Sequence, residues 1–290
     1  MDTLLSTIEK LYPTFSKGQR RIAEFIINSY DDAAFMTAYK LGERVGVSES
    51  TVVRFAYTLG MDGYPALQAA LQELVRHRLT SVQRIRLAAG IPQQEVLKTV
   101  LTSDMNNIRT TIDMIDNQSF QGAIDAILRA RRIYVIGVRS AMALAQFLAY
   151  YLDYVCDNVV LVTGAMQDIQ ERMLRVNAED VCFGISFPRY SARTVSAMKY
   201  AGERGATLIA LTDQNSSPLA EVSHYTLCAR SDMASFADSL VAPLSLLDAI
   251  IVGVGLARKD EAYQHLTQLE SIWNDEGVYV NDAARKDGAQ

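Results

Sequence analysis

Residues 39–60, YKLGERVGVSESTVVRFAYTLG, narrow most strongly what this chain can fold into. They predict a helix that ends at a tight turn on Gly46 and a second helix that begins at Ser48. The Ser48 side chain can accept a hydrogen bond from the amide of Ser50 or Thr51, which satisfies one unpaired N–H group at the helix start. A short helix, a glycine-containing turn and a capped second helix are the signature of a helix-turn-helix.

The second of these helices has two chemically different faces. A step of 100° per residue places four apolar positions in one sector, which we predict to be buried: Val52, Phe55, Ala56 and Leu59. The opposite face carries hydroxyls and a cation, the groups that contact base edges and phosphates. The sequence therefore predicts a helix that lies in the DNA major groove. An ordinary amphipathic helix with a solvated face is the alternative interpretation.

The distribution of charge supports a DNA-binding front half. Residues 1–90 hold 11 Lys and Arg against 9 Asp and Glu, a balance of +2, and the rest hold 17 against 24, a balance of −7. A balance of +2 is small, so binding would depend on a few placed cations: Lys17, Arg20, Arg21, Arg44 and Arg54. The DNA-binding residues that we predict are Ser48, Ser50, Thr51, Arg54, Tyr57, Lys17 and Arg21.

From residue 120 onward, short apolar runs alternate with helical segments. The runs are Ile133–Val138, Val159–Thr163, Val181–Phe187, Leu208–Thr212 and Tyr225–Cys228. Continuous apolar strands interleaved with helices indicate a parallel sheet that is covered on both faces. We therefore predict an all-α helix-turn-helix domain followed by an α/β doubly wound parallel five-stranded sheet. In the strand order 2-1-3-4-5, the first and third strands are neighbours, and ligands bind beyond their carboxyl ends.

Two loops at those carboxyl ends carry anion-binding chemistry. The sequence GVRSA at 137–141 follows the first strand, and SFPRYSART at 186–194 follows the third. Hydroxyls and helix N-terminal amides can hold a phosphate or carboxylate, and arginines can bind an oxyanion with two parallel bonds. The predicted effector site comprises Arg139, Ser140, Ser186, Arg189, Tyr190, Ser191, Arg193 and Thr194. Alternatively, Ser140 and Ser191 only cap the helices that follow them.

The sequence offers little that could support catalysis or bind a metal. The three histidines lie outside these loops: His77, His224 and His265. There is no nucleophile elbow, Walker loop or metal-binding signature. The three cysteines are widely separated in apolar segments, without a CxxC pair, so we expect reduced core thiols. We predict no catalytic residue, no metal and no cofactor.

The length of 290 residues is sufficient for two domains. We predict a DNA-binding domain at 1–80, a helical linker at 81–118, an effector-binding domain at 119–265 and a polar tail at 266–290. No apolar run approaches the length of a membrane span, and the first 30 residues lack the layout of a secretory signal. We therefore expect a cytoplasmic protein that does not contact a membrane.

Three motifs carry a resemblance to a known family: VSESTVVRF at 47–55, GVRS at 137–140, and the stretch 186–191. Over about residues 1–265 the chain resembles the RpiR-type transcriptional regulators, also called the MurR/RpiR family. These regulators join an N-terminal helix-turn-helix domain to a C-terminal sugar isomerase (SIS) domain that senses a metabolite. The resemblance implies a regulator of a carbohydrate or related catabolic operon, bound to a double-stranded DNA operator as a homodimer or homotetramer.

The loop after the third strand departs from the family pattern. In SIS domains this loop is usually Ser-x-Ser-Gly-x-Thr/Ser and binds a sugar phosphate. Here Ser186 and Ser191 match the outer hydroxyls, while Pro188 and Arg189 replace the central Ser-Gly. Pro188 offers neither a hydroxyl nor an amide proton to a phosphate. The expected small-molecule effector is therefore a sugar phosphate, a sugar acid or a polyol.

Two functions of other classes stay open from the sequence. One is a SIS-type sugar phosphate isomerase with a helical N-terminal extension, although the nearest loop offers Tyr190 and no carboxylate base. The other is a helical adaptor that binds protein, although the polar face of Ser50, Arg54 and Tyr57 is unlike an apolar docking surface.

Overall fold

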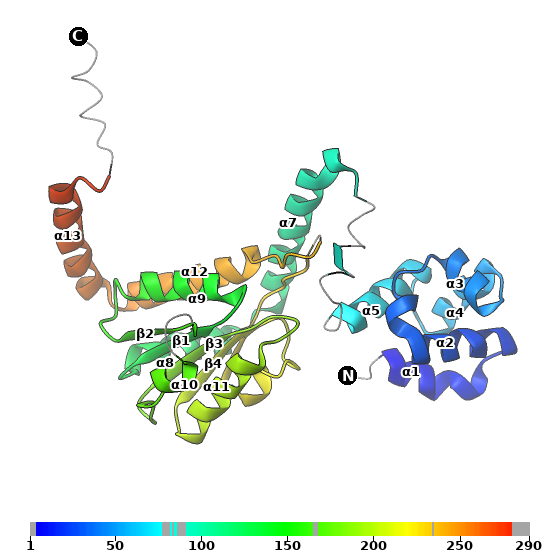
Figure 1. The fold of residues 1–290 in the computed structure, drawn as a ribbon, viewed down its shortest axis with the longest axis horizontal. Helices are drawn as coiled ribbons and strands as arrows, with labels where there is room; N and C mark the ends of the chain where they lie inside the picture. The colour runs from blue at the N-terminus through cyan, green and yellow to red at the C-terminus, as the bar shows by residue number, and fades with distance from the viewer. Residues whose placement is uncertain are drawn as a thin grey trace, which may run out of the picture. The chain divides into compact units, whose positions relative to one another are not determined.

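The computed structural model describes residues 4–76, 82, 84, 85, 91–164, 168–233 and 235–279 (Figure 1). The chain divides into two units, Met1–Gln93 and Gln94–Gln290. His77, residues 86–90 of the predicted linker and residues 280–290 of the predicted tail lie outside the described residues.

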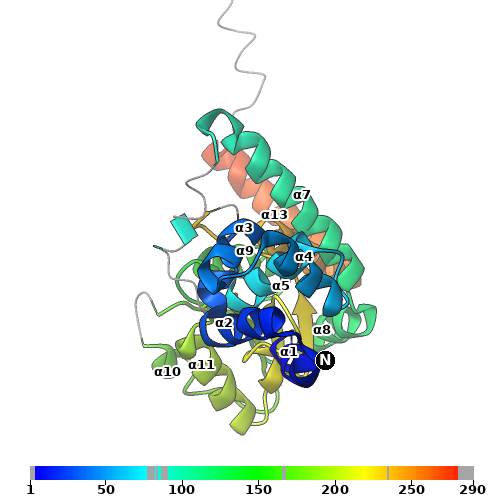
Figure 2. The ribbon, with the colours of Figure 1, turned by 90° about the vertical axis from the view of Figure 1, so that its right-hand side faces the viewer.

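The first unit is built from helices whose starts are set by capping side chains. The elements are α1 (Leu4–Leu11), η1 (Tyr12–Thr14), α2 (Lys17–Ala33), α3 (Ala38–Val45), α4 (Glu49–Thr58) and α5 (Tyr64–Arg76) (Figure 2). Ser16 and Gln19 form a reciprocal capping box at the start of α2, and Thr37 caps α3. The core of the unit includes Ile22, Ile26, Leu41, Phe55 and Leu67, all fully buried.

The helix-turn-helix forms as predicted. Gly46 ends α3 in the left-handed conformation, with φ of +71°, which glycine adopts without steric cost. Ser48 then caps α4 by accepting a bond from the Thr51 amide at 3.3 Å. The predicted inner face is confirmed, since Val52, Phe55, Ala56 and Leu59 are all buried.

The second unit contains five parallel strands. They are β1 (Ile133–Gly137), β2 (Val159–Val162), β3 (Val181–Ile185), β4 (Thr207–Thr212) and β5 (Tyr225–Cys228). Their order is β2-β1-β3-β4-β5, so the predicted fold class and strand order are confirmed. Ile133 of β1 pairs with Val159 on one side and Val181 on the other. The chain adds β2 on one side of β1 and then β3 to β5 on the other side. Ligand crevices in such folds open at this switch point, between β1 and β3.

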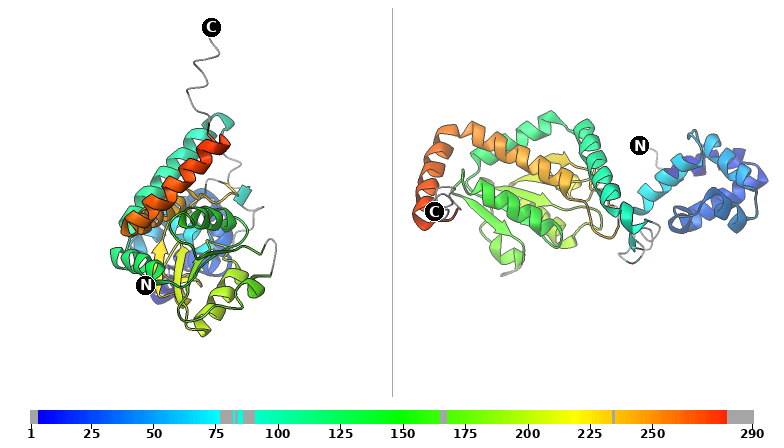
Figure 3. Two further views of the ribbon diagram at one scale, coloured as in Figure 1. Left: turned by 90° about the vertical axis from the view of Figure 1, so that its left-hand side faces the viewer. Right: turned by 90° about the horizontal axis from the view of Figure 1, so that it is seen from above.

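Helices cover both faces of this sheet (Figure 3). The helical elements are η2 (Gln93–Glu95), α7 (Val96–Met114), α8 (Asn117–Arg129), α9 (Ala141–Leu152), α10 (Ile169–Arg172), α11 (Ala192–Glu203), η3 (Ala220–Val222), α12 (Val241–Ala257) and α13 (Lys259–Glu276). Val135 and Phe183 pack on one face with α8, α9 and α12, whereas Tyr134 and Cys182 pack on the other with α10 and α11. This alternation follows the two-residue period of a strand.

The last described helix, α13, extends the fold beyond the predicted boundary. It stays helical through Glu276, so residues 266–276 of the predicted polar tail form a helix. Trp273 of α13 packs against Tyr154, with ring centroids 6.1 Å apart, and against Tyr279 at 5.5 Å. No single helix in the described part of the chain has the length and composition of a membrane span; only α12 and α13 together do, across a 103° bend.

Candidate functional site

The outer face of α4 carries a connected set of hydroxyls. The Ser48 Oγ lies 3.0 Å from the Ser50 Oγ and 2.9 Å from the Thr51 Oγ1. Ser50, Arg54 and Tyr57 are exposed, and the Arg54 Nε donates to the Ser50 carbonyl at 3.3 Å. Exposed hydroxyls beside a guanidinium group are chemically suited to contact phosphates and base edges.

The start of α2 lies beside the start of α4. A Cβ atom added at Gly18 would lie 3.3 Å from the Thr51 Cγ2, so the Thr51 side chain packs against the α2 backbone there. A Cβ atom at Gly46 would lie 3.2 Å from a guanidinium nitrogen of Arg21. Lys17 and Arg21 are both exposed, and they therefore add two cations next to α4 and the turn that precedes it.

Arg20 has a different environment from these two cations. Its guanidinium donates to the carbonyls of Phe15 at 3.0 Å and Pro13 at 3.2 Å, and it lies over the Tyr12 ring. These contacts hold the turn between α1 and α2, so Arg20 has a structural role there, and its part in DNA binding stays a prediction.

In the second unit, the loop after β3 closes on itself. Ser186 is buried, and its Oγ accepts a bond from the Ser191 amide at 3.0 Å. The Ser191 Oγ in turn caps α11 by accepting from the Thr194 amide at 3.3 Å. The capping interpretation therefore holds for Ser191. Thr194 is fully buried and its hydroxyl is not accessible from solvent in this structure.

Two arginines at adjacent loop tips have strained backbones. Arg139 follows β1 with φ of +57°, and Arg189 follows β3 with φ of +65°. They are the only non-glycine residues with positive φ in the described part of the chain. This conformation costs roughly 1–2 kcal/mol per residue, and such strain clusters at functional sites. Arg189 occupies the position of the family's glycine, which adopts this conformation freely.

Ser140 does not cap the helix that it precedes. No side-chain capping bond is present at the start of α9, and the Ser140 Oγ donates instead to the Asp238 carboxylate at 3.2 Å. The interpretation of Ser140 as a helix cap is therefore wrong. A Cβ atom at Gly137 would lie 2.6 Å from the Ala141 carbonyl oxygen, so α9 packs directly against the end of β1.

A buried carboxylate, which the sequence analysis missed, adjoins this edge of the sheet. Asp213 directly follows β4 and is only 1% exposed. The Tyr190 hydroxyl donates to its Oδ1 at 2.7 Å, and the Thr212 hydroxyl does so at 3.3 Å. Its Oδ2 is buried without a hydrogen-bond partner among the described residues. Its position directly after the apolar run Leu208–Thr212 could have identified Asp213 from the sequence as a candidate site residue.

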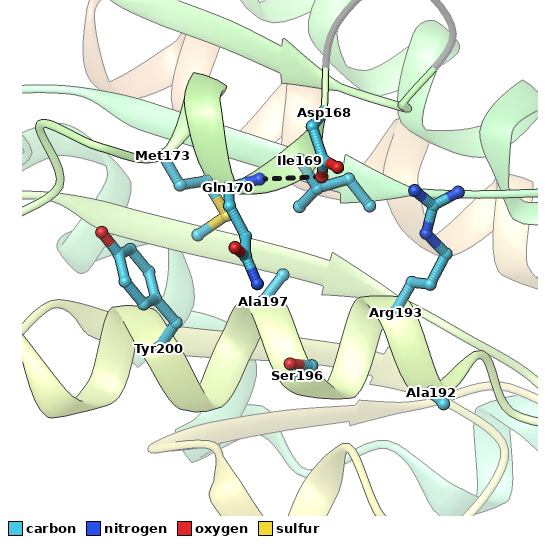
Figure 4. A pocket seen from close by; sticks show the side chains of 9 residues that line it. All are labelled: Asp168, Ile169, Gln170, Met173, Ala192, Arg193, Ser196, Ala197 and Tyr200. Carbon is cyan, nitrogen blue, oxygen red and sulfur yellow. Dashed lines mark hydrogen bonds between the residues drawn. The ribbon is translucent and has the colours of Figure 1, made fainter.

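Arg193, in the first turn of α11, lines a hollow beside the other predicted effector residues. It lines this hollow of about 250 Å³ between α10 and α11, together with Asp168, Gln170, Ser196 and Tyr200. Figure 4 shows its side chain rising from the start of α11 toward the segment that carries Asp168. A Cβ atom at Gly164 would lie 3.9 Å from an Arg193 guanidinium nitrogen. Arg193 thus contributes a cation at the side of the site next to β2.

The cysteines and His224 are part of the protein's structural core contacts. The three cysteines are free and buried, and burial raises the pKa of each thiol, to about 11 for Cys228, where Asp213 adds to the effect. The His224 Nδ1 accepts a bond from the Leu208 amide at 2.9 Å. Among the described residues, no group of three His, Cys, Asp or Glu could hold a metal ion.

Two family models match the chain, one in each of its two structural units. The model of the helix-turn-helix domain of the rpiR family matches residues 2–77, and that of the SIS domain matches residues 126–253. An HTH-type transcriptional regulator of Haemophilus influenzae is 26% identical over 268 residues, which cover 90% of this chain and 93% of the relative. The HTH-type transcriptional regulator HexR of Pseudomonas aeruginosa is 25% identical over 283 residues, covering 93% and 95%.

Solved structures share the fold. The Vibrio vulnificus NanR protein, complexed with ManNAc-6P, matches with a TM-score of 0.58 at 22% identity, covering 96% of this chain and 100% of NanR. The sugar isomerase domain of an RpiR transcription factor from Sphaerobacter thermophilus matches with a TM-score of 0.59 at 24% identity, covering 61% and 99%.

Proposed function

Because the chain belongs to the RpiR family of helix-turn-helix regulators with a SIS domain, we propose that it controls a carbohydrate or related catabolic operon in response to a small metabolite. It is a DNA-binding regulator and not an enzyme, since relatives that cover at least 90% of it are HTH-type transcriptional regulators. Its site of action would be the cytoplasm, where the operator is found.

The operator would be bound through α4. Ser50, Arg54 and Tyr57 face outward from a helix whose other face is buried in the core of the unit. Lys17 and Arg21 would add phosphate contacts from α2, which fix the orientation of a recognition helix without reading sequence. One such helix contacts few bases, so the protein would bind DNA as a homodimer or homotetramer.

The strained arginines carry the proposal of an anion-binding effector site. Arg139, which precedes Ser140, and Arg189, in the loop that begins at Ser186, hold left-handed backbones after two neighbouring strands. Pro188 removes one amide and one hydroxyl from the family's phosphate-binding loop, and guanidinium groups can replace them with parallel bonds to a phosphate or carboxylate. NanR, which shares the fold, binds ManNAc-6P. The effector would be a sugar phosphate, a sugar acid or a polyol.

Calorimetric titration of full-length protein with sugar phosphates, sugar acids and polyols tests this site. Arg189→Ala should weaken the tightest ligand about tenfold or more, because a hydrogen bond to a charged group contributes roughly 1.5–3 kcal/mol. Arg129→Ala is the matched control, since Arg129 is also exposed but lies at the end of α8, by the opposite edge of the sheet. Equal affinity in Arg189→Ala and wild type would refute the proposed site.

A further inference from the structure

The helix α7 is held to its unit in an unusual way. Its most buried side chains are polar, Asn107 at 2% and Thr111 at 5% exposure. None of its residues belongs to an apolar core cluster of the described chain. Leu97, Met105 and Ile112 are instead exposed on its outer face. α7 thus lies against α12 and is anchored at its two buried positions by polar side chains that need hydrogen-bond partners.

Those hydrogen bonds come from the β5–α12 loop, described here at residues 229–233 and 235–240. The Asn107 Nδ2 donates to the Asp232 carbonyl at 2.8 Å, and the Asp232 amide donates back to the Asn107 Oδ1 at 3.1 Å. The Arg230 amide donates to the Thr111 Oγ1 at 2.9 Å. Buried donors are costly to leave without partners, so these bonds hold the loop to α7.

The same loop reaches the proposed effector site. Asp238 accepts the bond from Ser140 at 3.2 Å, and the next residue, Ser239, donates to Asp104 of α7 at 2.6 Å. Adjacent loop residues thus hold Ser140 on one side and α7 on the other. A hollow of about 290 Å³, lined by Val100 and Asp104 of α7 and by residues 235 and 237–241, leaves space beside these contacts.

We propose that the β5–α12 loop is an effector-responsive latch on α7. A ligand that binds the Ser140 hydroxyl takes it from Asp238, and the loop then releases Asp104, Asn107 and Thr111. In sequence, α7 is the first long helix after the DNA-binding unit, so its release is a signal that the operator-binding half can receive. The inference rests on the proposed function, because it places the effector at Ser140. By linkage, an operator that favours latched α7 weakens effector binding by the same factor.

Hydrogen–deuterium exchange of full-length protein tests whether loss of the Ser140–Asp238 bond frees the loop from α7. The reporters are the amides of Arg230 and Asp232, which donate to α7 and do not contact Ser140. Ser140→Ala removes the donor to Asp238 and should raise their exchange about fivefold or more, the lower end of typical coupling. Ser140→Thr keeps the hydroxyl and should exchange as wild type does. Unchanged exchange in Ser140→Ala would overturn the latch.

A second pair of variants confirms that these amides report on α7. Thr111→Val removes the acceptor of the Arg230 amide and should raise its exchange with or without ligand, whereas Thr111→Ser should not. Thermal melts monitored by circular dichroism identify any variant that fails to fold. Protected exchange in a folded Thr111→Val would show that the loop is held by other contacts, and would also overturn the latch.

Ligand addition separates the latch from the proposed function. Inorganic phosphate and gluconate serve as probes, with binding measured by calorimetry. A bound probe should raise exchange in wild type and have no further effect in Ser140→Ala. If a probe binds through Arg189 yet leaves exchange unchanged, the latch is wrong and the effector site stands. If neither probe binds while Ser140→Ala still opens the loop, the latch is supported and the effector is neither a phosphate ion nor a gluconate-like acid.

Discussion

Arg189 combines a strained backbone with the charge that the proposed effector site needs. Its φ of +65° suits glycine, whereas an alanine keeps the steric cost. Arg189→Gly and Arg189→Ala lose the same side-chain contacts, so the comparison isolates the backbone. We expect the glycine variant to be more stable by up to about 1 kcal/mol, after the greater freedom of glycine in the unfolded chain is subtracted. Urea unfolding would measure this, and a less stable glycine variant would contradict it.

Arg54 should contribute to operator binding without contributing to folding. Its side chain is exposed, and its hydrogen bond among the described residues goes to the Ser50 carbonyl, one turn earlier in α4. If Arg54 contacts phosphate, Arg54→Ala should weaken binding across all sequences and lower the salt slope by about 1. If it reads guanine, about 1–3 kcal/mol of discrimination should be lost at one position. Fluorescence anisotropy at several salt concentrations distinguishes the two outcomes.

Lys199→Ala is the control for Arg54→Ala, because Lys199 is an exposed cation on α11 of the other unit. Equal operator affinity in wild type and Arg54→Ala would remove Arg54 from the predicted interface.

Local contacts could be predicted from the sequence, and distant ones could not. Ser48 capping joins residues three apart and follows from residue type and spacing. The Ser140–Asp238 bond spans 98 residues, and the Tyr190–Asp213 bond spans 23. Ser140 bonds to a distant residue, whereas Ser191 caps the helix that follows it. Both serines precede a helix in the sequence, so their positions do not distinguish the two roles.

At the scale of elements, α4 depends on Phe55. This ring is fully buried and packs edge-on against Phe15, with centroids 5.2 Å apart. Phe55→Ala should destabilise the first unit by about 3–5 kcal/mol through lost burial and a residual cavity. Phe236→Ala, which truncates a mostly exposed ring, should change stability little. Calorimetric melts would test both, and a Phe55→Ala protein as stable as wild type would refute the packing role.

The contact between β1 and α9 depends on the absence of a side chain at Gly137. A Cβ atom there would lie 2.6 Å from the Ala141 carbonyl oxygen and 2.8 Å from the Ala145 Cβ. Gly137→Ala should therefore destabilise the second unit by about 1–3 kcal/mol. Gly255→Ala is the matched control, since a Cβ atom in that part of α12 meets nothing within 4 Å. It should stabilise the helix by about 0.5–1 kcal/mol, and urea unfolding would compare the two variants.

The elements of the sheet were easier to predict than α7. Apolar runs bounded by helical segments identified all five strands, because burial on both faces leaves a continuous pattern. The sequence predicted only a helical linker at 81–118, and α7 lies within it. In the structure its buried side carries Asn107 and Thr111, because the facing loop offers backbone groups that need partners.

At the scale of the whole molecule, we expect at least a dimer that recognises a palindromic or repeated operator. Half-sites in a groove-matched dimer should lie about 10 bp apart or a multiple of that. A candidate for the dimer interface is α12, on which Val252 and Leu256 are exposed, while Leu247 and Ile250 are buried in the core. Sedimentation of a monomer at micromolar concentration with DNA present would contradict this prediction.

The packing of Trp273 has a spectroscopic consequence. The sequence has one tryptophan and 14 tyrosines, and this tryptophan lies on α13 against Tyr154. Tyr154 lies two residues after the end of α9, and the start of that helix lies against the end of β1 beside Ser140. Selective excitation of the indole therefore reports on a single position of the chain, without any attached dye. Its emission colour and quenching provide an intrinsic optical record of whether α13 stays docked while ligands and DNA are added.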